Sequence, residues 1–297
     1  IAAAHLDWSV HLEPVYRPGA VEIPNRQSIV RSDTDEVFQI FTGSYQPLQN
    51  KQAFQFFDAV VAQGQAIYHT AGSLAGGRRV WILAQLPGDL PIPGADQDLL
   101  SRYILLANSH DGSLAVHMKV TPIRVVCQNT LTMALNGQDQ RHFRTEHQGD
   151  VLNRVVEARE VVGLTDAYMA LFMAGVDRMV QTQFNQNDLN HLLWDLYKLD
   201  PDKLLSDQFH LKRMAYEETL RLFEVGRGQD LPGVRGTGWA AYNAVVEFVD
   251  YLAPVGTSQK SFGSQDHQDK RLTSAWFGNG EKLKKDAWKS ILEMATN

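Results

Sequence analysis

The stretch SHDGSLAVHMKVTPIRVVCQNTLTMAL, residues 109–135, decides the architecture of the first half of the chain. Asp111-Gly112 lies between two apolar runs, and this dipeptide favours a tight hairpin because a type I′ turn requires positive φ at both central residues. The preceding run, residues 103–107, is continuously apolar, which indicates a strand covered on both faces. Apolar and polar residues alternate over 114–120, which indicates a second strand with one buried face.

The alternation slips by one residue at Thr121-Pro122, after which Ile123 and Val125 become the apolar set. A one-residue slip turns the wrong side chains inward, so the sequence predicts a bulge or a strand break at this point. Pro122 has no N–H to donate to a sheet and suits such a break. Beyond it, Gln128-Asn129-Thr130 supplies polar capping residues and predicts the start of a helix.

The residues before this stretch predict more strands and one helix. Residues 1–27 contain three prolines and predict an extended arm with one strand near Trp8 to Leu12. Two hairpins are expected, one about the turn at 32–35 and one about the turn at 75–78. Asn50 is expected to cap a helix. Residues 87–98 carry three prolines and three aspartates and predict an acidic surface loop.

The second half of the chain has helical periodicity throughout. A strong helix is predicted over Trp239–Leu252 with Thr237 as its cap, and a glycine-rich linker is predicted at 226–238. We therefore expect an α+β fold, with an antiparallel sheet of about six strands and an inserted helix in a first domain, residues 1–148. A mainly helical region, residues 149–297, follows it.

Composition excludes several classes of protein. The chain has 297 residues, 44% hydrophobic and 21% charged, which is typical of a globular protein with a sizeable core. Its net charge of −6 gives no overall basic field for nucleic acid, although a local patch is compatible with it. The single cysteine excludes an internal disulfide and favours a cytoplasmic location. No apolar run is long enough for a membrane span, and we expect no cofactor.

Several segments together resemble a known family, the phage/plasmid-like proteins that are grouped as a prokaryotic domain of unknown function. The resemblance covers nearly the whole chain and rests on Leu6-Asp7-Trp8, IVRSDTDEV (29–37), YQPLQNKQAFQFFD (45–58), TAGSLAGGRRVW (70–81), SHDGSLAV (109–116), TPIRVVCQNTL (121–131), GTGWAAYNAVVEFVDY (236–251) and FGNGEKLKKDA (277–287). The chain departs from the family pattern at 38–41, where a leucine-glycine-valine strand is expected. The resemblance implies a protein of phages, plasmids and integrative elements, and it carries over no activity and no catalytic residue.

Two constellations of residues suggest catalytic or metal chemistry. Cys127 is a candidate nucleophile with His117 or His142 as its base, and the alternative is a small apolar side chain on an inward strand face. A metal site is the second candidate, and its alternative is a solvated helix entry, because the spacing matches no recognised site. Its residues would be His142, Glu146, His147 and Asp150.

A third candidate is a polar stripe on the predicted helix after Thr237. Asn243, Glu247 and Asp250 share one helical face, and two carboxylates with an amide are groups that hold a cation or position a substrate. The alternative interpretation is the solvated side of an amphipathic helix.

The last candidate is a surface for phosphate or single-stranded DNA. Such a surface needs cations with stacking aromatic rings, and the alternative places the aromatic rings in the core and the arginines on an ordinary surface. The residues expected in it are Arg78, Arg79, Lys119, Arg124, Trp81 and Tyr45.

These observations favour a non-enzymatic protein of a mobile element that binds or anneals single-stranded DNA as a homo-oligomer, in the context of recombination. One alternative is a metal-dependent enzyme that uses Glu247 and Asp250 with histidines. A second alternative is an interaction module that acts on a host factor. The sequence leaves the catalytic residues unknown.

Overall fold

The computed structural model describes residues 1–43, 45–62, 66–133, 142–145, 165–200, 202, 210–255 and 265–296. Its chain divides into two compact units, each made from segments that are not consecutive in sequence. Unit 1 comprises residues 1–87, 103–120 and 141–165, and unit 2 comprises residues 88–102, 121–140 and 166–297. Each unit is described separately below.

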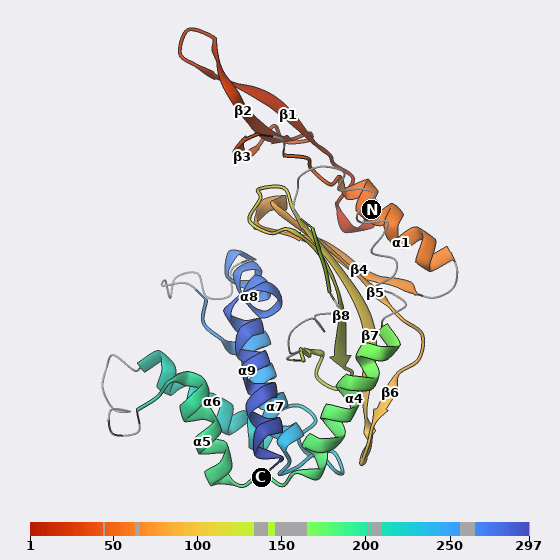
Figure 1. Ribbon diagram of the computed structural model, residues 1–297, viewed down its shortest axis with the longest axis vertical. Coiled ribbons are helices and arrows are strands. Elements are labelled where there is room, and N and C mark those ends of the chain that lie inside the picture. The colour runs from red at the N-terminus through yellow and green to blue at the C-terminus, as the bar shows by residue number, and fades with distance from the viewer. Residues whose placement is uncertain are drawn as a thin grey trace. The chain divides into compact units, whose positions relative to one another are not determined.

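The N-terminal residues of unit 1 form a short 3-10 turn and a three-stranded antiparallel sheet. The elements are η1 (Ala2–Ala4), β1 (Val10–Arg17), β2 (Val21–Arg31) and β3 (Val37–Thr42), in the strand order β1-β2-β3. β3 pairs only with residues 26–30 of β2, so the outer part of the β1–β2 hairpin is a two-stranded ribbon (Figure 1). Residues 1–27 therefore contain two strands, where the sequence predicted an extended arm with one.

The second sheet has seven antiparallel strands. Its order is β10-β8-β7-β5-β4, with β6 paired to β7 and β9 paired to β8. The division between the units falls inside β7 and β8. The strands are β4 (Ile67–Leu74), β5 (Arg79–Gln85), β6 (Leu90–Ile92), β7 (Ala95–Ser109), β8 (Val116–Arg124), β9 (Asn129–Thr130) and β10 (His142–Thr145), with the 3-10 turn η2 (Ala75–Gly77) between β4 and β5.

The core of unit 1 lies between the sheets and helix α1 (Asn50–Ala62). Alternate residues of β5, Val80, Ile82 and Ala84, are buried in this core. They are joined there by Leu6 and Leu48, which lie before the strands of this sheet in sequence. The alternation predicted for 114–120 is confirmed in β8, where Val116 and Met118 are buried and the residues that follow each of them are half-buried.

Unit 2 is built from helices packed about α7. Aromatic contacts connect three of them: Phe172 stacks on Trp288 at 4.8 Å, and Trp288 meets Tyr242 edge-on at 5.3 Å, measured between ring centroids. The elements are α4 (Thr165–Gln181), α5 (Gln186–Tyr197), α6 (His210–Val225), α7 (Gly238–Glu247), the π-helical turn η6 (Phe248–Leu252), α8 (Gln265–Phe277) and α9 (Asn279–Met294). The α+β class predicted from the sequence is confirmed, and helices dominate the C-terminal part.

The structure of residues 109–135 differs from the prediction in two places. β8 runs through Thr121-Pro122 with no break, because residues 120–124 are all buried and both faces of the strand are covered there. A one-residue shift in the alternation of apolar and polar residues therefore leaves no apolar side chain facing water at this point. The predicted helix start at 128–130 is wrong, because Asn129 and Thr130 form β9 and pair with Arg124 and Ile123.

The turn between β7 and β8 is also longer than the two-residue hairpin that Asp111-Gly112 predicted. Residues 110–115 connect the strands. The hydroxyl of Ser109 closes this loop, since it donates to the carbonyl of Leu114 and accepts from the amide of the same residue.

Two segments predicted as surface or linker are packed in unit 2. Residues 87–98 contain β6 and the start of β7; Asp89 and Asp96 are exposed as predicted, whereas Asp98 is completely buried. The glycine-rich segment 226–238 joins α6 to α7 within unit 2, where a Cβ on Gly233 would meet the carbonyl of Gly94 at 1.9 Å. This segment does not separate domains, and the two units differ from the consecutive domains 1–148 and 149–297.

Candidate functional site

The recognisable segments of the sequence assemble into two clusters, one in each unit. Those at 6–8, 29–37, 70–81 and 109–116 meet in unit 1, where they form what we call the arginine–aromatic cluster. Those at 121–131, 236–251 and 277–287 meet in unit 2, where they form what we call the buried ionic network. The two differ in how far water reaches their charges.

The arginine–aromatic cluster places two guanidinium groups on aromatic rings. Arg31 lies 4.3 Å from the centroid of Trp8, and Arg78 lies 5.3 Å from that of Phe38, which are distances for cation–π attraction. Gly77 makes this packing achievable, because it has a φ of +100° and a Cβ would lie 2.9 Å from Arg31 and 3.1 Å from Trp8.

A histidine lies behind the two rings. His110 is completely buried, 5.3 Å from Trp8 and 6.3 Å from Phe38 between ring centroids. Its Nε2 is 3.0 Å from Oδ1 of Asn50, whose amide nitrogen donates to the carbonyls of Leu6 and Trp8. Asn50 therefore ties helix α1 to the N-terminal segment and positions the imidazole.

Carboxylates pair with the arginines at the surface of this cluster. Asp33 accepts from Nε of Arg31 at 2.6 Å and from Nη2 at 2.8 Å, and this hydrogen-bonded pair lowers the pKa of Asp33. Glu36 lies 2.8 Å from Arg78. Arg79, the next residue, donates to the hydroxyl of Ser113. These pairs are exposed to water, where ion pairs are worth little.

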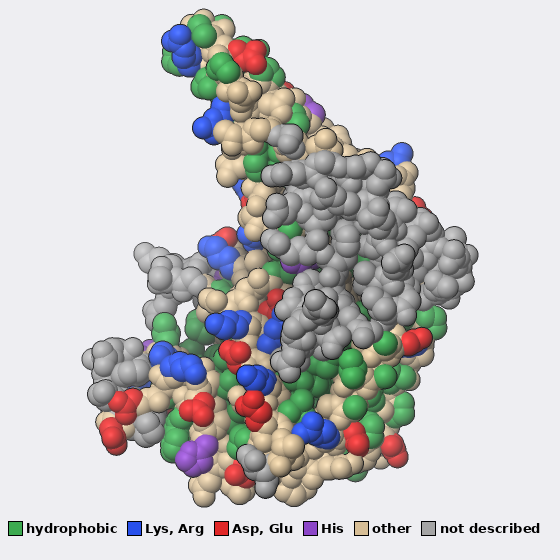
Figure 2. Space-filling model, in the orientation of Figure 1, with side chains coloured by type: hydrophobic (Ala, Val, Ile, Leu, Met, Phe, Trp, Pro, Cys, Tyr) green, Lys and Arg blue, Asp and Glu red, His purple; other side chains and the backbone are tan. Residues whose placement is uncertain are grey.

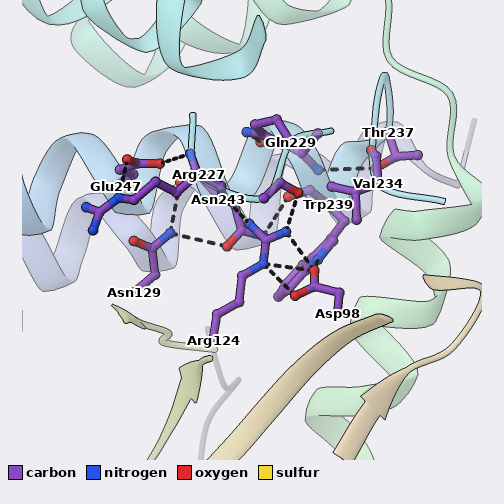
Figure 3. Close-up of polar contacts among 12 residues, drawn as sticks. Asp98, Arg124, Asn129, Arg227, Gln229, Val234, Thr237, Trp239, Asn243 and Glu247 are labelled. Atoms are coloured by element: carbon purple, nitrogen blue, oxygen red, sulfur yellow. Dashed lines mark hydrogen bonds and ion pairs between the residues drawn. The ribbon is translucent and has the colours of Figure 1, made fainter. Parts of the chain in front are cut away.

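The buried ionic network is centred on Asp98 and Arg124, which are both completely buried in unit 2 (Figure 3). Nε of Arg124 donates to both carboxylate oxygens at 2.8 Å, and its Nη2 lies 2.7 Å from Oδ2. Trp239 donates its indole N–H to the same Oδ2 at 2.9 Å. The remaining donors of Arg124 reach the carbonyls of Arg227 and Gly228. The free-energy cost of removing a charged group from water is much lower when the group is paired in this way.

The network continues along one side of α7. Glu247 accepts from the side chain of Arg227 at 2.9 Å and from its backbone N–H at 3.1 Å. Asn243 accepts from the amide of Asn129 and donates to the carbonyl of Trp239. Asn243 and Glu247 are thus buried, and the prediction of a solvated helix face is wrong for them.

A second buried ion pair, between Lys284 and Asp250, joins α9 to the turn η6 that follows α7. Lys284, which is completely buried, donates to Asp250 and to the carbonyl and hydroxyl oxygens of Thr130. Asp250 also accepts from the backbone N–H and hydroxyl of Thr130. All three ammonium protons of Lys284 therefore have acceptors within the protein.

Cys127 lies in unit 2 beside this network and is buried. Burial raises the pKa of its thiol to about 11. A thiol with such a pKa is almost entirely protonated at neutral pH, and the thiolate is the nucleophilic form. This environment favours the structural interpretation of Cys127 over the nucleophilic one.

The residues predicted to contact DNA are not brought to one surface. Arg78 and Arg79 lie at the rim of the arginine–aromatic cluster, and Trp81 and Lys119 are half-buried on strands of unit 1. Tyr45 is buried, and its hydroxyl donates to the carbonyl of Ser109. The structure excludes Arg124 from a surface role because all its side-chain contacts are internal.

The predicted metal ligands Glu146, His147 and Asp150 lie outside the described residues, as does the side chain of His142. Within the part of the chain that the structure describes, no group of three or more metal-ligating side chains is found. Glu247 and Asp250 are paired with cations of the chain itself, so a cation at the polar stripe would have to displace Arg227 or Lys284.

Sequence reasoning missed most of the partners in both clusters. Asp98 was assigned to an acidic loop, Arg31, Trp8 and His110 were given no role, and Lys284 was not expected to pair with a carboxylate. The only available signal was that each of the last four lies in a segment that carries the family resemblance.

The fold and the two clusters define an α+β protein with a buried ionic network and a half-buried arginine–aromatic cluster. The chain belongs to the family described as Domain of unknown function (DUF932), whose model matches residues 37–276. Among the described helices, none has the length and hydropathy that crossing a bilayer requires.

Two curated relatives from Escherichia coli (strain K12) match a short part of the chain. UPF0380 protein YafZ is 42% identical over 64 residues, which are 21% of this chain and 22% of that protein. UPF0380 protein YfjQ is 42% identical over 62 residues, 20% of this chain and 22% of that protein. The chain thus spans about a fifth of the length of the curated relatives it matches. No solved structure matches.

Proposed function

We propose that this chain is a non-enzymatic protein of phages, plasmids or related mobile elements that binds single-stranded DNA as a homo-oligomer, in the cytoplasm. The mobile-element part rests on the segments that resemble the phage/plasmid-like proteins. The DNA-binding part rests on one observation: in unit 1, Arg31 at the end of β2 and Arg78, which precedes Arg79 at the start of β5, each lie over an aromatic ring.

These arginines are half-buried, with 18% of the Arg31 side chain and 33% of the Arg78 side chain exposed, so that water and a phosphate can reach them. A guanidinium binds phosphate through paired N–H donors, as it binds a carboxylate. Because exposed ion pairs contribute only about 0–1 kcal/mol, a phosphate can replace Asp33 or Glu36 as the partner of Arg31 or Arg78 at little cost. The completely buried pair of Asp98 and Arg124 offers no such exchange.

The surface charge elsewhere supports the choice of this rim. On the face shown in Figure 2, basic and acidic side chains are interspersed over the described C-terminal helices. Ion pairs at i,i+4 along α9, such as Lys285 with Glu281 and Lys289 with Glu293, account for part of this mixing. Mixed charge of this kind provides no concentrated positive field for a polyanion on that face, and we therefore assign the DNA contact to unit 1, where arginines lie over aromatic rings.

The homo-oligomer part of the proposal draws on the β1–β2 ribbon. Tyr16 and Val21 on its outer part are 55% and 44% exposed. Charged side chains also lie on this ribbon (Figure 2). A two-stranded ribbon without further packing is marginally stable in water, which favours a covering partner. Light scattering of the purified chain measures its oligomeric state directly. A monomer at micromolar concentration would remove the oligomer from the proposal.

DNA binding is tested with a fluorescently labelled single-stranded oligonucleotide over a range of salt concentrations. We expect the affinity to fall as salt rises, because bound cations are released from the phosphates. The double variant Arg78→Ala with Arg79→Ala should weaken binding about tenfold or more and reduce the slope of log K against log salt by roughly 1.4, at about 0.7 for each lost phosphate contact.

The matched control is Arg221→Ala with Arg235→Ala, which removes the same charge from exposed positions of unit 2. The control should leave binding unchanged. The proposal fails if the unaltered chain does not retain the oligonucleotide at low salt, or if the control loses as much affinity as the rim variant.

A further inference from the structure

A cavity of about 480 Å³ opens in unit 1 beside the arginine–aromatic cluster. Its volume lies within the range of small-molecule binding pockets, roughly 300–1,000 Å³. Two segments that carry the family resemblance supply most of its lining. The lining residues are Ile1, Leu6, Asp7, Trp8, Ser9, Gln49, Lys51, Gln52 and Gln55.

The cavity has an apolar floor and a polar rim. Leu6 and Trp8 are buried beneath it, whereas Asp7, Lys51 and Gln55 are exposed. This combination of an apolar base with a few polar groups is typical of small-molecule sites, in which the polar groups fix the orientation of the ligand.

Gln49 is committed to the fold. Its amide nitrogen donates to the carbonyl of Val10 at 2.8 Å, and its oxygen accepts from the N–H of Val10 at 3.0 Å. Gln52 accepts from the backbone N–H of Gln49 and is half-buried. The exposed side chains of Lys51 and Gln55, one turn apart on α1, are therefore the groups we assign to a ligand.

Trp8 connects the cavity to the arginine rim. One side of the indole borders the cavity, and Arg31 lies 4.3 Å from its ring centroid. The turn that precedes Arg78 packs on the same indole, since a Cβ on Gly77 would lie 3.1 Å from it. A strand of nucleic acid with its phosphates on the arginines would thus have a neighbouring base within reach of the cavity.

We propose that this cavity receives one unstacked base of single-stranded DNA. Leu6 and Trp8 form the apolar surface under the base, Gln55 hydrogen-bonds its edge, and Lys51 contacts the adjoining phosphate. An amide suits this task because it supplies both a donor and an acceptor, and bases carry both. The inference rests on the proposed function, because it names where a base of the same strand goes.

The experiment compares two oligonucleotides of equal length and charge. One is a 20-nucleotide single strand of deoxycytidine, and the other has abasic deoxyribose at every position. The unaltered chain should bind the deoxycytidine strand about tenfold or more tightly than the abasic strand, since a base held by a protein contributes affinity that phosphates alone do not.

The variant Lys51→Ala with Gln55→Ala changes two exposed positions of α1. It should lose most of the preference for the deoxycytidine strand while it keeps at least a third of the affinity for the abasic strand, to which the arginine rim still binds. Retained abasic binding and an unchanged far-UV circular dichroism spectrum show that the variant is folded. Lys289→Ala with Gln186→Ala, on exposed helix positions of unit 2, is the matched control and should keep the preference.

The outcomes separate the two proposals. If the unaltered chain binds both strands equally and salt-sensitively, or if the variant keeps the preference, the cavity inference is wrong and DNA binding at the rim stands. If neither strand is retained at low salt, the proposed function fails and the cavity inference fails with it.

Discussion

The arginine–aromatic cluster of unit 1 and the buried ionic network of unit 2 use the same residue types for different ends. Arg31 and Arg78 pair with carboxylates at the surface, where water screens the charges. Arg124 and Lys284 pair with carboxylates in the interior, where each is completely buried. Burial therefore separates the two kinds of ion pair in this chain: those of unit 2 are shut off from water, and the carboxylates of those in unit 1 are in contact with it.

The buried pairs hold distant segments of unit 2 together. Asp98 at the start of β7, Arg124 at the end of β8 and Trp239 at the start of α7 are joined by direct hydrogen bonds. A partner removed from such a network leaves an uncompensated charge in the interior, which costs much more than the pair contributes when intact. The ion pairs of unit 1 lack this penalty. Four substitutions test this difference between the two clusters.

The largest effect is expected for Asp98→Asn. The substitution keeps the volume of the side chain but leaves the guanidinium of Arg124 buried without a counter-charge. We expect a loss of about 3–5 kcal/mol in the free energy of unfolding, measured by urea denaturation followed by circular dichroism. A loss below about 1 kcal/mol would show that water reaches this pair and would remove the distinction between the two clusters.

The second-largest effect is the contribution of Cys127 to the pH dependence of the unfolding free energy. The folded pKa of the thiol, about 11, lies above its ordinary value of 9.0, so the folded chain holds the proton more tightly than the unfolded chain. The resulting stabilisation is fully present below about pH 9 and is lost as the pH rises toward 11. Between pH 8 and pH 11 the unaltered chain should lose about 2 kcal/mol more than Cys127→Ala.

Other buried groups also titrate at alkaline pH, so the difference between the two chains is the relevant measurement. Tyr242 and Tyr251 have raised pKa values because of burial, and both are present in each chain. Parallel stability curves from pH 8 to pH 11 would contradict the burial of the thiol.

A third substitution, Gly77→Ala, tests the packing of the arginine–aromatic cluster. The new methyl group would meet Arg31 at 2.9 Å and Trp8 at 3.1 Å, at a residue with a φ of +100°. We expect a loss of about 1–3 kcal/mol in unfolding free energy. Gly19→Ala is the control, because its φ is +90° but nothing lies within 4 Å of the added carbon. Equal losses in both variants would show that backbone strain alone is responsible.

The smallest effect is expected for Asp33→Asn. The carboxylate is exposed and its pKa is lowered by the hydrogen bond from Arg31, so the pair stabilises the fold weakly at neutral pH and loses that contribution as the carboxylate is protonated in acid. Removal of the charge should leave the unfolding free energy almost unchanged, because water screens this pair. If the rim binds DNA, the same variant should bind more tightly, because a competitor of the phosphate is gone. Weaker binding would contradict the exchange that the proposal requires.

Local patterns predicted the elements of this fold better than its contacts. The hairpin about residues 32–35, the strands that flank 75–78 and the cap at Thr237 follow from turn chemistry and capping, and the structure confirms them. The predictions fail where packing against distant segments, and not the local sequence pattern, determines the structure. β8 tolerates a phase slip because both of its faces are buried beyond Val120, and residues 128–130 form a strand because β8 offers them a partner.

The sequence by itself determined the α+β class, most hairpins and helices, and the segments in which chemistry concentrates. Only the tertiary structure decided that Asp98 neutralises Arg124, that Asp250 neutralises Lys284, and that Arg31 and Arg78 stay within reach of water. A turn or a cap is set by residues a few positions apart, and such residues are visible in the sequence. The partner of a charge depends on which segments the fold brings together, across 26 residues for Arg124 and 34 for Lys284. No local pattern records that choice.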